Sequence, residues 1–78
     1  MLLDVSVLSP KEIVFEGKAK SVILPGEAGV FEVLPLHKRL LGRLVSGVMF
    51  VDNQGFRLQR GIAMINQNKV TVVIEERE

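Results

Sequence analysis

Residues 22–37 read VILPGEAGVFEVLPLH, and this stretch indicates the fold more clearly than any other part of the chain. An apolar run ends at Pro25-Gly26, a short turn follows, and a second apolar run ends at Pro35. Proline cannot donate a hydrogen bond to a neighbouring strand, and glycine accepts positive φ angles, so both residues favour turns here. The stretch therefore predicts two strands joined by a tight, polar turn over residues 25–29.

Short apolar runs separated by turn residues continue along the whole chain. Leu3, Val5 and Val7 alternate with polar neighbours, which is the period of a half-buried strand. The predicted strands cover residues 3–7, 13–16, 18–24, 30–34, 45–51, 56–60, 62–65 and 69–74. Gly17 is expected to break a strand, and Asp52-Asn53-Gln54-Gly55 to form a hairpin turn. This spacing predicts an all-β fold, a small antiparallel sandwich or barrel.

One segment, residues 36–44, does not fit this alternation. Its leucines have the spacing i, i+4, i+5, i+8, which is typical of a helix. Gly42 weakens a helix, and nine residues after a proline make a short one. Either a helical turn or an irregular strand is expected.

Composition bounds the function. The 78 residues predict a single domain over residues 1–78, and the absence of cysteine excludes disulfides. The net charge of +1 gives no general attraction to nucleic acid, and no apolar run approaches the roughly 18 residues of a membrane span. Residues 1–4 do not resemble a signal peptide. A soluble cytoplasmic protein, with no nucleic-acid partner and no insertion into a membrane, is expected.

Little in the sequence points to catalysis. His37 is the single histidine, and no nucleophile or paired carboxylates are spaced to work with it. Gly26 and Gly29 bracket a turn but lack the strand–glycine loop–helix pattern of a phosphate site. We therefore predict no catalytic residue, no metal ligand and no cofactor.

A docking surface is a better-supported interpretation. Lys38, Arg39 and Arg43 form a basic cluster, with Leu36, Leu40 and Leu41 between the charges. Apolar residues rimmed by charge indicate an interface. Nucleic-acid surfaces usually add aromatic residues for base stacking, and the four phenylalanines look like core residues.

Several motifs together resemble a known family. Ser9-Pro10, Phe15-Glu16-Gly17, the stretch 22–37 and Asn68-Lys69-Val70-Thr71-Val72 occur in the order seen in the N-terminal β-sandwich domain of the ε subunit of F-type ATP synthase. The resemblance implies a flattened antiparallel sandwich of two five-stranded sheets, about ten short strands in all. It also implies a non-catalytic subunit, present in one copy at the foot of the rotating central stalk.

The resemblance implies partners as well. In this family the domain holds the γ subunit and rests on the membrane c-ring, which couples proton or sodium flow to ATP synthesis. The matching γ-facing residues are Ser9, Pro35, Leu36 and His37, followed by Leu40 and Leu41. The matching c-ring-facing residues are Glu27, Ala28, Gly29 and Val30. The implied location is the cytoplasmic side of the bacterial inner membrane, peripheral through the complex.

The chain also departs from the family pattern. Family members usually read Gly-Glu-Phe-Gly-Val-Leu-Pro-Gly-His-Ala-Pro where residues 29–39 read GVFEVLPLHKR. Val30 thus replaces an acidic residue, Glu32 and Leu36 replace glycines, and Arg39 replaces a proline. These changes predict that the sandwich is kept and that the docking surface is altered.

Two further expectations concern regulation and alternatives. Many bacterial ε subunits continue into a helical hairpin that binds ATP and inhibits hydrolysis, whereas this sequence ends at Glu78. A naturally short subunit and a shortened chain both fit, and neither is expected to bind ATP.

The alternative function is a generic β-sandwich module for carbohydrate or peptide, which would need an exposed aromatic platform. A small enzyme is a third class, disfavoured by the composition.

Overall fold

The computed structural model describes residues 1–76, and within that range the chain is all-β. The prediction of an all-β fold is confirmed, with nine strands in place of about ten. The strands are β1 (Leu3–Leu8), β2 (Ile13–Ala19), β3 (Val22–Gly26), β4 (Gly29–Val33), β5 (Leu40–Leu44), β6 (Gly47–Val51), β7 (Gln54–Leu58), β8 (Arg60–Asn66) and β9 (Lys69–Glu76).

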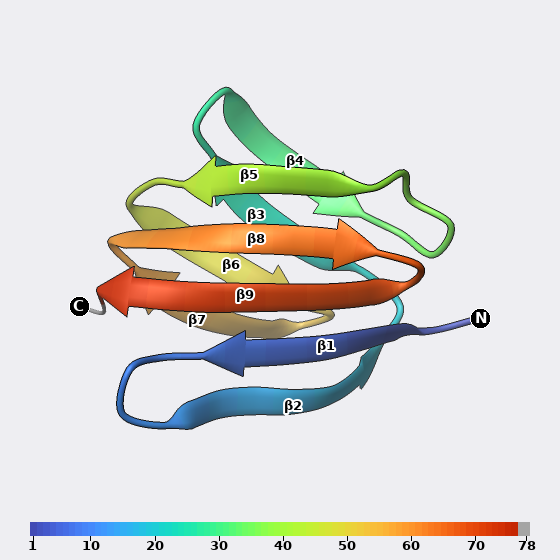
Figure 1. Ribbon diagram of the computed structural model, residues 1–78, viewed down its shortest axis with the longest axis horizontal. Helices are drawn as coiled ribbons and strands as arrows, with labels where there is room; N and C mark the ends of the chain where they lie inside the picture. Colours follow the sequence, from blue (N-terminus) through green and yellow to red (C-terminus); the bar gives the residue numbers. More distant parts are fainter. Residues whose placement is uncertain (77–78) are drawn as a thin grey trace.

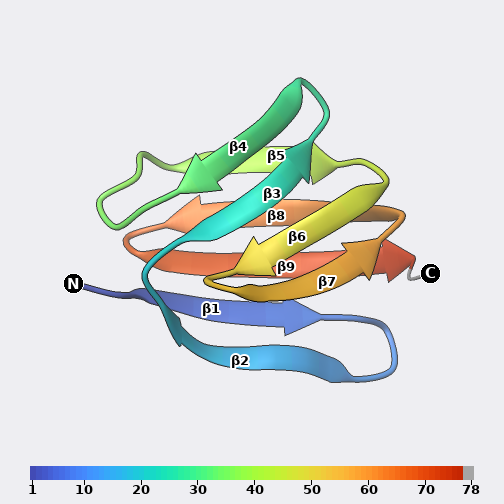
Figure 2. The same cartoon turned by 180° about the vertical axis from the view of Figure 1, so that it is seen from behind.

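The strands form one curled sheet that folds over on itself into two layers (Figures 1 and 2). Hydrogen bonding follows the order β2-β1-β9-β8-β5-β3-β6-β7, and β4 pairs with β3. One layer holds β2, β1, β9, β8 and β5, and the other holds β4, β3, β6 and β7. The layers are joined where Gly26 of β3 pairs with Leu44 of β5. They therefore contain five and four strands, compared with the expected five and five.

The first and last strands lie side by side near the middle of the five-stranded layer. β1 and β9 are parallel, with Val5 opposite Val70 and Val7 opposite Val72. The expected antiparallel arrangement is therefore wrong for this pair. β9 also pairs antiparallel with β8, so it has a partner on each edge.

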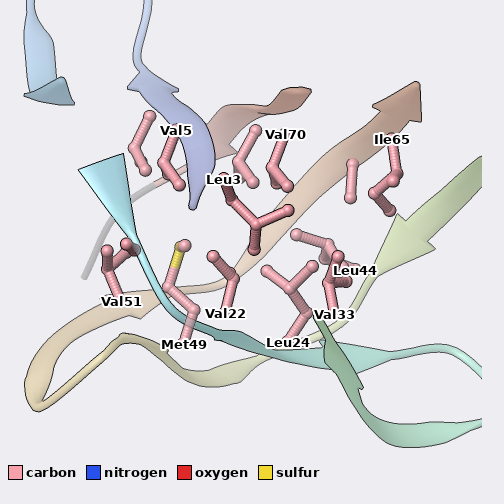
Figure 3. Packing of buried hydrophobic residues seen from close by; sticks show 14 of the residues in the cluster. Leu3, Val5, Val22, Leu24, Val33, Leu44, Met49, Val51, Ile65 and Val70 are labelled. Carbon is pink, nitrogen blue, oxygen red and sulfur yellow. The ribbon is translucent and has the colours of Figure 1, made fainter. Parts of the chain in front are cut away.

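The core lies between the two layers (Figure 3). It is built from the side chains that point inward at alternate positions along the strands. Leu24, Met49 and Ile74 are fully buried, and among the described residues no charged or polar side chain is buried with them. A buried aliphatic side chain of this size contributes about 1.5–3 kcal/mol through the hydrophobic effect. The core therefore depends on apolar packing between the layers.

One local expectation is wrong, and another is decided between its two alternatives. Gly17 does not end a strand: it lies inside β2, opposite Val5, and the chain turns later, at Lys20-Ser21. For residues 36–44 the strand alternative is confirmed over residues 40–44, which form β5 and pair with β8. The pairing determines the backbone here, and the helix-like spacing of the leucines has no structural counterpart.

Candidate docking surfaces

The four residues matched to the c-ring contact lie together at the β3–β4 turn. Gly26 pairs with Gly29, so Glu27 and Ala28 form a two-residue loop and β3 runs through Pro25, beyond the predicted strand end. Gly29 has φ 134°, a conformation that favours glycine. Val30 follows it with 74% of its surface exposed. The turn therefore presents a short polar tip with an exposed apolar residue beside it.

The β3–β4 turn is held close to β5. The backbone N–H of Glu27 donates to the carbonyl oxygen of Arg43 at 3.1 Å, and the N–H of Val45 donates to the oxygen of Pro25 at 2.9 Å. An open groove of about 420 Å³ runs beside the turn, and Phe31, Leu40 and Arg43 complete its lining. Both hydrogen bonds join the turn to the same end of β5, on either side of Leu44.

Pro35, Leu36 and His37 lie in the connection between β4 and β5, at the other end of β5. The His37 N–H donates to the carbonyl oxygen of Leu34 at 3.1 Å, which closes a turn. Leu36 has φ 70° and is 77% exposed. Its N–H donates to Asn68 Oδ1 at 2.6 Å, and the imidazole Nδ1 of His37 lies 2.7 Å from the carbonyl oxygen of Lys38. The connection is therefore anchored to the β8–β9 turn.

Leu40 and Leu41 point to opposite sides of β5. Leu40 packs against the core, whereas Leu41 is 72% exposed. Leu41 lies opposite Met64 of β8, which is itself 41% exposed. A surface groove of about 460 Å³ is lined by both of these residues and by Arg39. Leu41 is thus available to a partner, and Leu40 is largely a structural residue.

Ser9 is separated from the other residues matched to γ. It lies in the β1–β2 turn, where its N–H donates to the carbonyl oxygen of Glu12 at 2.9 Å and its Oγ accepts from the Glu12 N–H at 3.3 Å. Figure 1 shows this turn at one end of the five-stranded layer and the β4–β5 connection at the other. The structure therefore brings Pro35, Leu36, His37 and Leu41 to one end of the layer, and Ser9 to the opposite end.

Register reveals an outer apolar surface that was not predicted. On the outer face of the five-stranded layer, Ile62 pairs with Val73, Val73 with Leu8, and Leu8 with Ile13. Ile13 is 61% exposed. Ile13, Ile62 and Val73 were predicted to lie in strands and Leu8 fell just beyond the predicted strand 3–7, but no outer apolar face was predicted for any of them. These four side chains are apolar in the sequence, but only the strand order of the folded chain shows that they lie next to one another.

An exposed ion pair lies at the other end of β1 and β2 from Leu8 and Ile13. Lys18 Nζ lies 2.6 Å from Asp4 Oδ1, and both side chains are mostly exposed. The hydrogen bond and the positive charge of Lys18 lower the pKa of Asp4. In the part of the chain that the structure describes, no group of His, Asp and Glu side chains could hold a metal ion. No helix long and apolar enough to cross a membrane occurs in residues 1–76.

Comparison with known proteins identifies the family. The sequence profile of the "ATP synthase, Delta/Epsilon chain, beta-sandwich domain" matches residues 2–78. The chain belongs to this family. The resemblance noted from the sequence motifs is therefore confirmed, and the two-layered fold is the ATP synthase β-sandwich.

Relatives in the family are ε chains from bacteria and chloroplasts. The chain is 38% identical over 82 residues to the ATP synthase epsilon chain of Prochlorococcus marinus (strain MIT 9303), covering all of this chain and 62% of that one. It is 34% identical over 82 residues to the chloroplastic epsilon chain of Tetradesmus obliquus, covering all of this chain and 60% of the relative. The chain thus spans about 60% of the length of these ATP synthase relatives.

Solved structures share the ATP synthase sandwich. A chain in the central stalk and c-ring structure of the Tetrahymena thermophila mitochondrial ATP synthase matches with a TM-score of 0.80 at 12% identity, over 95% of this chain and 63% of that one. A chain of the Euglena gracilis mitochondrial ATP synthase matches with a TM-score of 0.82 at 14% identity, over 99% and 52%. At these identities the likeness establishes the fold.

Proposed function

We propose that the chain is a non-catalytic ε-type subunit of the central stalk of an F-type ATP synthase. It docks γ onto the c-ring and couples proton or sodium flow to ATP synthesis. The observation that carries this proposal is the family match across residues 2–78. The fold shared with chains of two ATP synthase structures supports it.

The two candidate surfaces suit an adapter between two partners. The β3–β4 turn offers Glu27, Ala28, Gly29 and Val30 to the c-ring, and the end of the layer at Pro35, Leu36, His37 and Leu41 faces γ. These surfaces lie at opposite ends of β5 (Figure 2). A subunit that transmits torque must contact both partners at once, and a sandwich with an apolar, closely packed core provides a stiff connection between them.

The location follows from the complex. The chain is placed on a membrane-associated ATP synthase, bound peripherally through its partners and in one copy. The relatives include chloroplastic and bacterial chains, so the compartment is left open between organelle and bacterium. The cytoplasmic side of a bacterial inner membrane remains one proposal for that compartment.

The alternative function, a generic ligand-binding sandwich, is not supported by any specific feature. Carbohydrate and peptide modules use exposed aromatic platforms, and this chain has no Trp or Tyr. Among the exposed large apolar side chains only Phe50, at 40%, is aromatic in the described residues, and the others are aliphatic, which suits a protein partner.

Co-purification tests the proposal directly. The full chain, tagged and co-expressed with the γ subunit from the same source, should recover γ in equal amounts and, with the c-ring present, a ternary complex. Membranes that lack the endogenous subunit should regain ion-driven ATP synthesis when the chain is supplied. A chain that recovers neither γ nor the c-ring would show that the family fold serves another role here.

A further inference from the structure

Strand β2 (Ile13–Ala19) forms the outer edge of the five-stranded layer (Figure 1). It pairs with β1 on one side, and in the described residues no strand pairs with its other side. The backbone N–H and C=O groups on that side can therefore bond to a further strand. The charges along β2 indicate which strand fits.

Within residues 1–76, three strands pair with a single neighbour: β2, β4 and β7. β4 carries one charged residue, Glu32, and β7 carries one, Arg57, so neither can set opposite charges against a second copy of itself. β2 carries Glu16 and Lys18, one of each sign, and both side chains are exposed. β2 is therefore the edge whose charges can complement its own copy.

A two-fold axis at Gly17 gives these charges a partner. When two copies of β2 run antiparallel about this axis, Glu16 of each copy lies opposite Lys18 of the other, and the contact occurs twice by symmetry. An axis at Glu16 would place two glutamates opposite each other, and an axis at Lys18 would do the same to two lysines. Pairing shifted by one residue would set outward side chains against inward ones.

The inner side of β2 is compatible with the same register. Phe15, which is partly buried, lies opposite Ala19 of the second copy, so a large side chain meets a small one. A Cβ built on Gly17 would lie 3.3 Å from Cζ of Phe15, so the phenylalanine ring already covers the glycine. The two backbones can therefore meet at Gly17 with no side chain between them.

We propose that free copies of the chain form a symmetric dimer by antiparallel pairing of β2 about Gly17, with Glu16–Lys18 ion pairs across the axis. The two five-stranded layers then join into one continuous sheet. Lys18 Nζ lies 2.6 Å from Asp4 Oδ1, and a lysine ammonium has N–H donors for both carboxylates. The inference concerns the unassembled chain and does not depend on the proposed function.

Charge reversal tests the ion pairs. In sedimentation equilibrium at up to about 1 mM, the wild-type chain should show a reversible monomer–dimer equilibrium. Glu16→Lys and Lys18→Glu should each weaken the dimer by about tenfold, because two symmetric attractive contacts become repulsive. Mixed in equal amounts, the two variants should form a heterodimer about as tight as the wild-type dimer, since the lysines of one chain then face the glutamates of the other. Glu32→Lys, which reverses an exposed charge on edge strand β4, is the matched control and should leave the equilibrium unchanged.

Cysteine cross-linking locates the axis independently. The chain contains no cysteine, so a single introduced cysteine reports on one contact. Gly17→Cys should form an intermolecular disulfide in mild oxidant, because residues facing each other across antiparallel strands have Cα atoms about 4.5–5.5 Å apart. Glu16→Cys should not, because in this register the two copies of residue 16 lie diagonally, about 7–8 Å apart. Thermal melts verify that each variant is folded.

Each contrary result has a distinct meaning. A wild-type chain that stays monomeric overturns the dimer, and the two charges would then serve to keep the edge free of partners. Weakening by Glu32→Lys in place of Glu16→Lys would assign the dimer to β4 and overturn the role of β2. Species larger than a dimer would indicate pairing of two different edges and overturn the symmetric contact. Cross-linking at residue 16 in place of residue 17 would overturn the register, and none of these results bears on γ binding, which co-purification measures separately.

Discussion

The β6–β7 turn and the β4–β5 connection use the same unusual backbone conformation to different ends. Asp52 in the first has φ 52°, and Leu36 in the second has φ 70°. The Asp52 carboxylate accepts hydrogen bonds from the backbone N–H groups of Lys20 and Ser21, at 2.9 and 3.1 Å. The Leu36 side chain projects from the surface. At Asp52 the residue's own side chain accepts the supporting hydrogen bonds, whereas at Leu36 the support comes from the Asn68 side chain and the leucine side chain stays exposed.

This difference separates structural turns from turns that present a side chain. Asp and Asn tolerate left-handed backbone and form local hydrogen bonds, so they occur in turns that hold a fold together. Asp52 closes the corner at Lys20-Ser21 between β2 and β3, where the chain passes from one layer to the other. Leucine has neither property, and its left-handed backbone is held by the Asn68 side chain while its own side chain is exposed.

The largest expected effect is the difference in stability between a substitution at Leu40, which packs against the core, and one at Leu41, which is exposed. Leu40→Asp should lower the free energy of unfolding by about 3 kcal/mol, because it removes apolar contact with the core and places a carboxylate beside it. Leu41→Asp, one residue along the same strand, should change it by about 0.5 kcal/mol or less. Urea unfolding followed by circular dichroism measures both. Equal losses for the two variants would contradict the assigned inward and outward directions.

The next largest effect concerns the two backbone hydrogen bonds that the Asp52 carboxylate accepts. Asp52→Ala removes the acceptor of two backbone hydrogen bonds and should cost about 2 kcal/mol of unfolding free energy. Asp52→Asn keeps an oxygen acceptor and tolerates positive φ, so most of the stability should remain. If alanine were as stable as asparagine in thermal melts, the carboxylate would not hold the corner between the layers.

Much of the fold could be predicted because it depends on local signals. The alternation of Leu3, Val5 and Val7 correctly indicated a buried face, and Asp52-Asn53 correctly indicated a turn; Pro25-Gly26 indicated the β3–β4 turn two residues too early, because both residues pair within the hairpin. The parallel pairing of β1 with β9 could not be predicted, since no local pattern records which distant strand lies alongside. Gly17 was interpreted as a break because glycine is unfavourable in strands, but pairing with Val5 outweighs that preference.

The candidate sites were predictable to a lesser extent. Glu27, Ala28, Gly29 and Val30 are consecutive, so their proximity followed from the sequence. The contact between Leu36 and Asn68 spans 32 positions and depends on two left-handed residues meeting, which only the folded chain shows. The exposure of Leu41 and the partial burial of Leu40 depend on the pairing of β5 with β8, which the sequence did not reveal.

Gly29, another residue with positive φ, extends the comparison to a position without a side chain. Gly29 has φ 134°, and a Cβ placed there would meet no atom within 4 Å, so any cost of Gly29→Ala comes from the backbone alone. The expected loss is about 1–2 kcal/mol. Ala28→Gly, in the same loop, is the control for added flexibility and should cost less. A neutral Gly29→Ala variant in urea unfolding would show that the turn can adopt another backbone conformation.

The smallest expected effect on stability is that of the exposed ion pair between Asp4 and Lys18. Asp4 has a pKa below its ordinary value of 3.8 because of the Lys18 hydrogen bond, so the stabilisation it provides is present above that pH and is lost as the pH falls further. Both side chains are exposed, and Asp4→Asn should leave the melting temperature at neutral pH unchanged within error. An NMR titration of Asp4 should show a midpoint below 3.8 that rises in Lys18→Gln. An unshifted midpoint would contradict the ion pair.

The position of β9 between β1 and β8 has a consequence for how the chain acquires its structure on the ribosome. Residues 69–76 are synthesised after every other strand, yet they bridge the β1–β2 hairpin to β8 and β5. Until they emerge, the five-stranded layer consists of two pieces whose facing edges are open. Such non-local pairing slows folding, so the native sheet is expected to close only after residues 69–76 have left the ribosome. The facing edges of β1 and β8 are then joined through β9, which pairs with both.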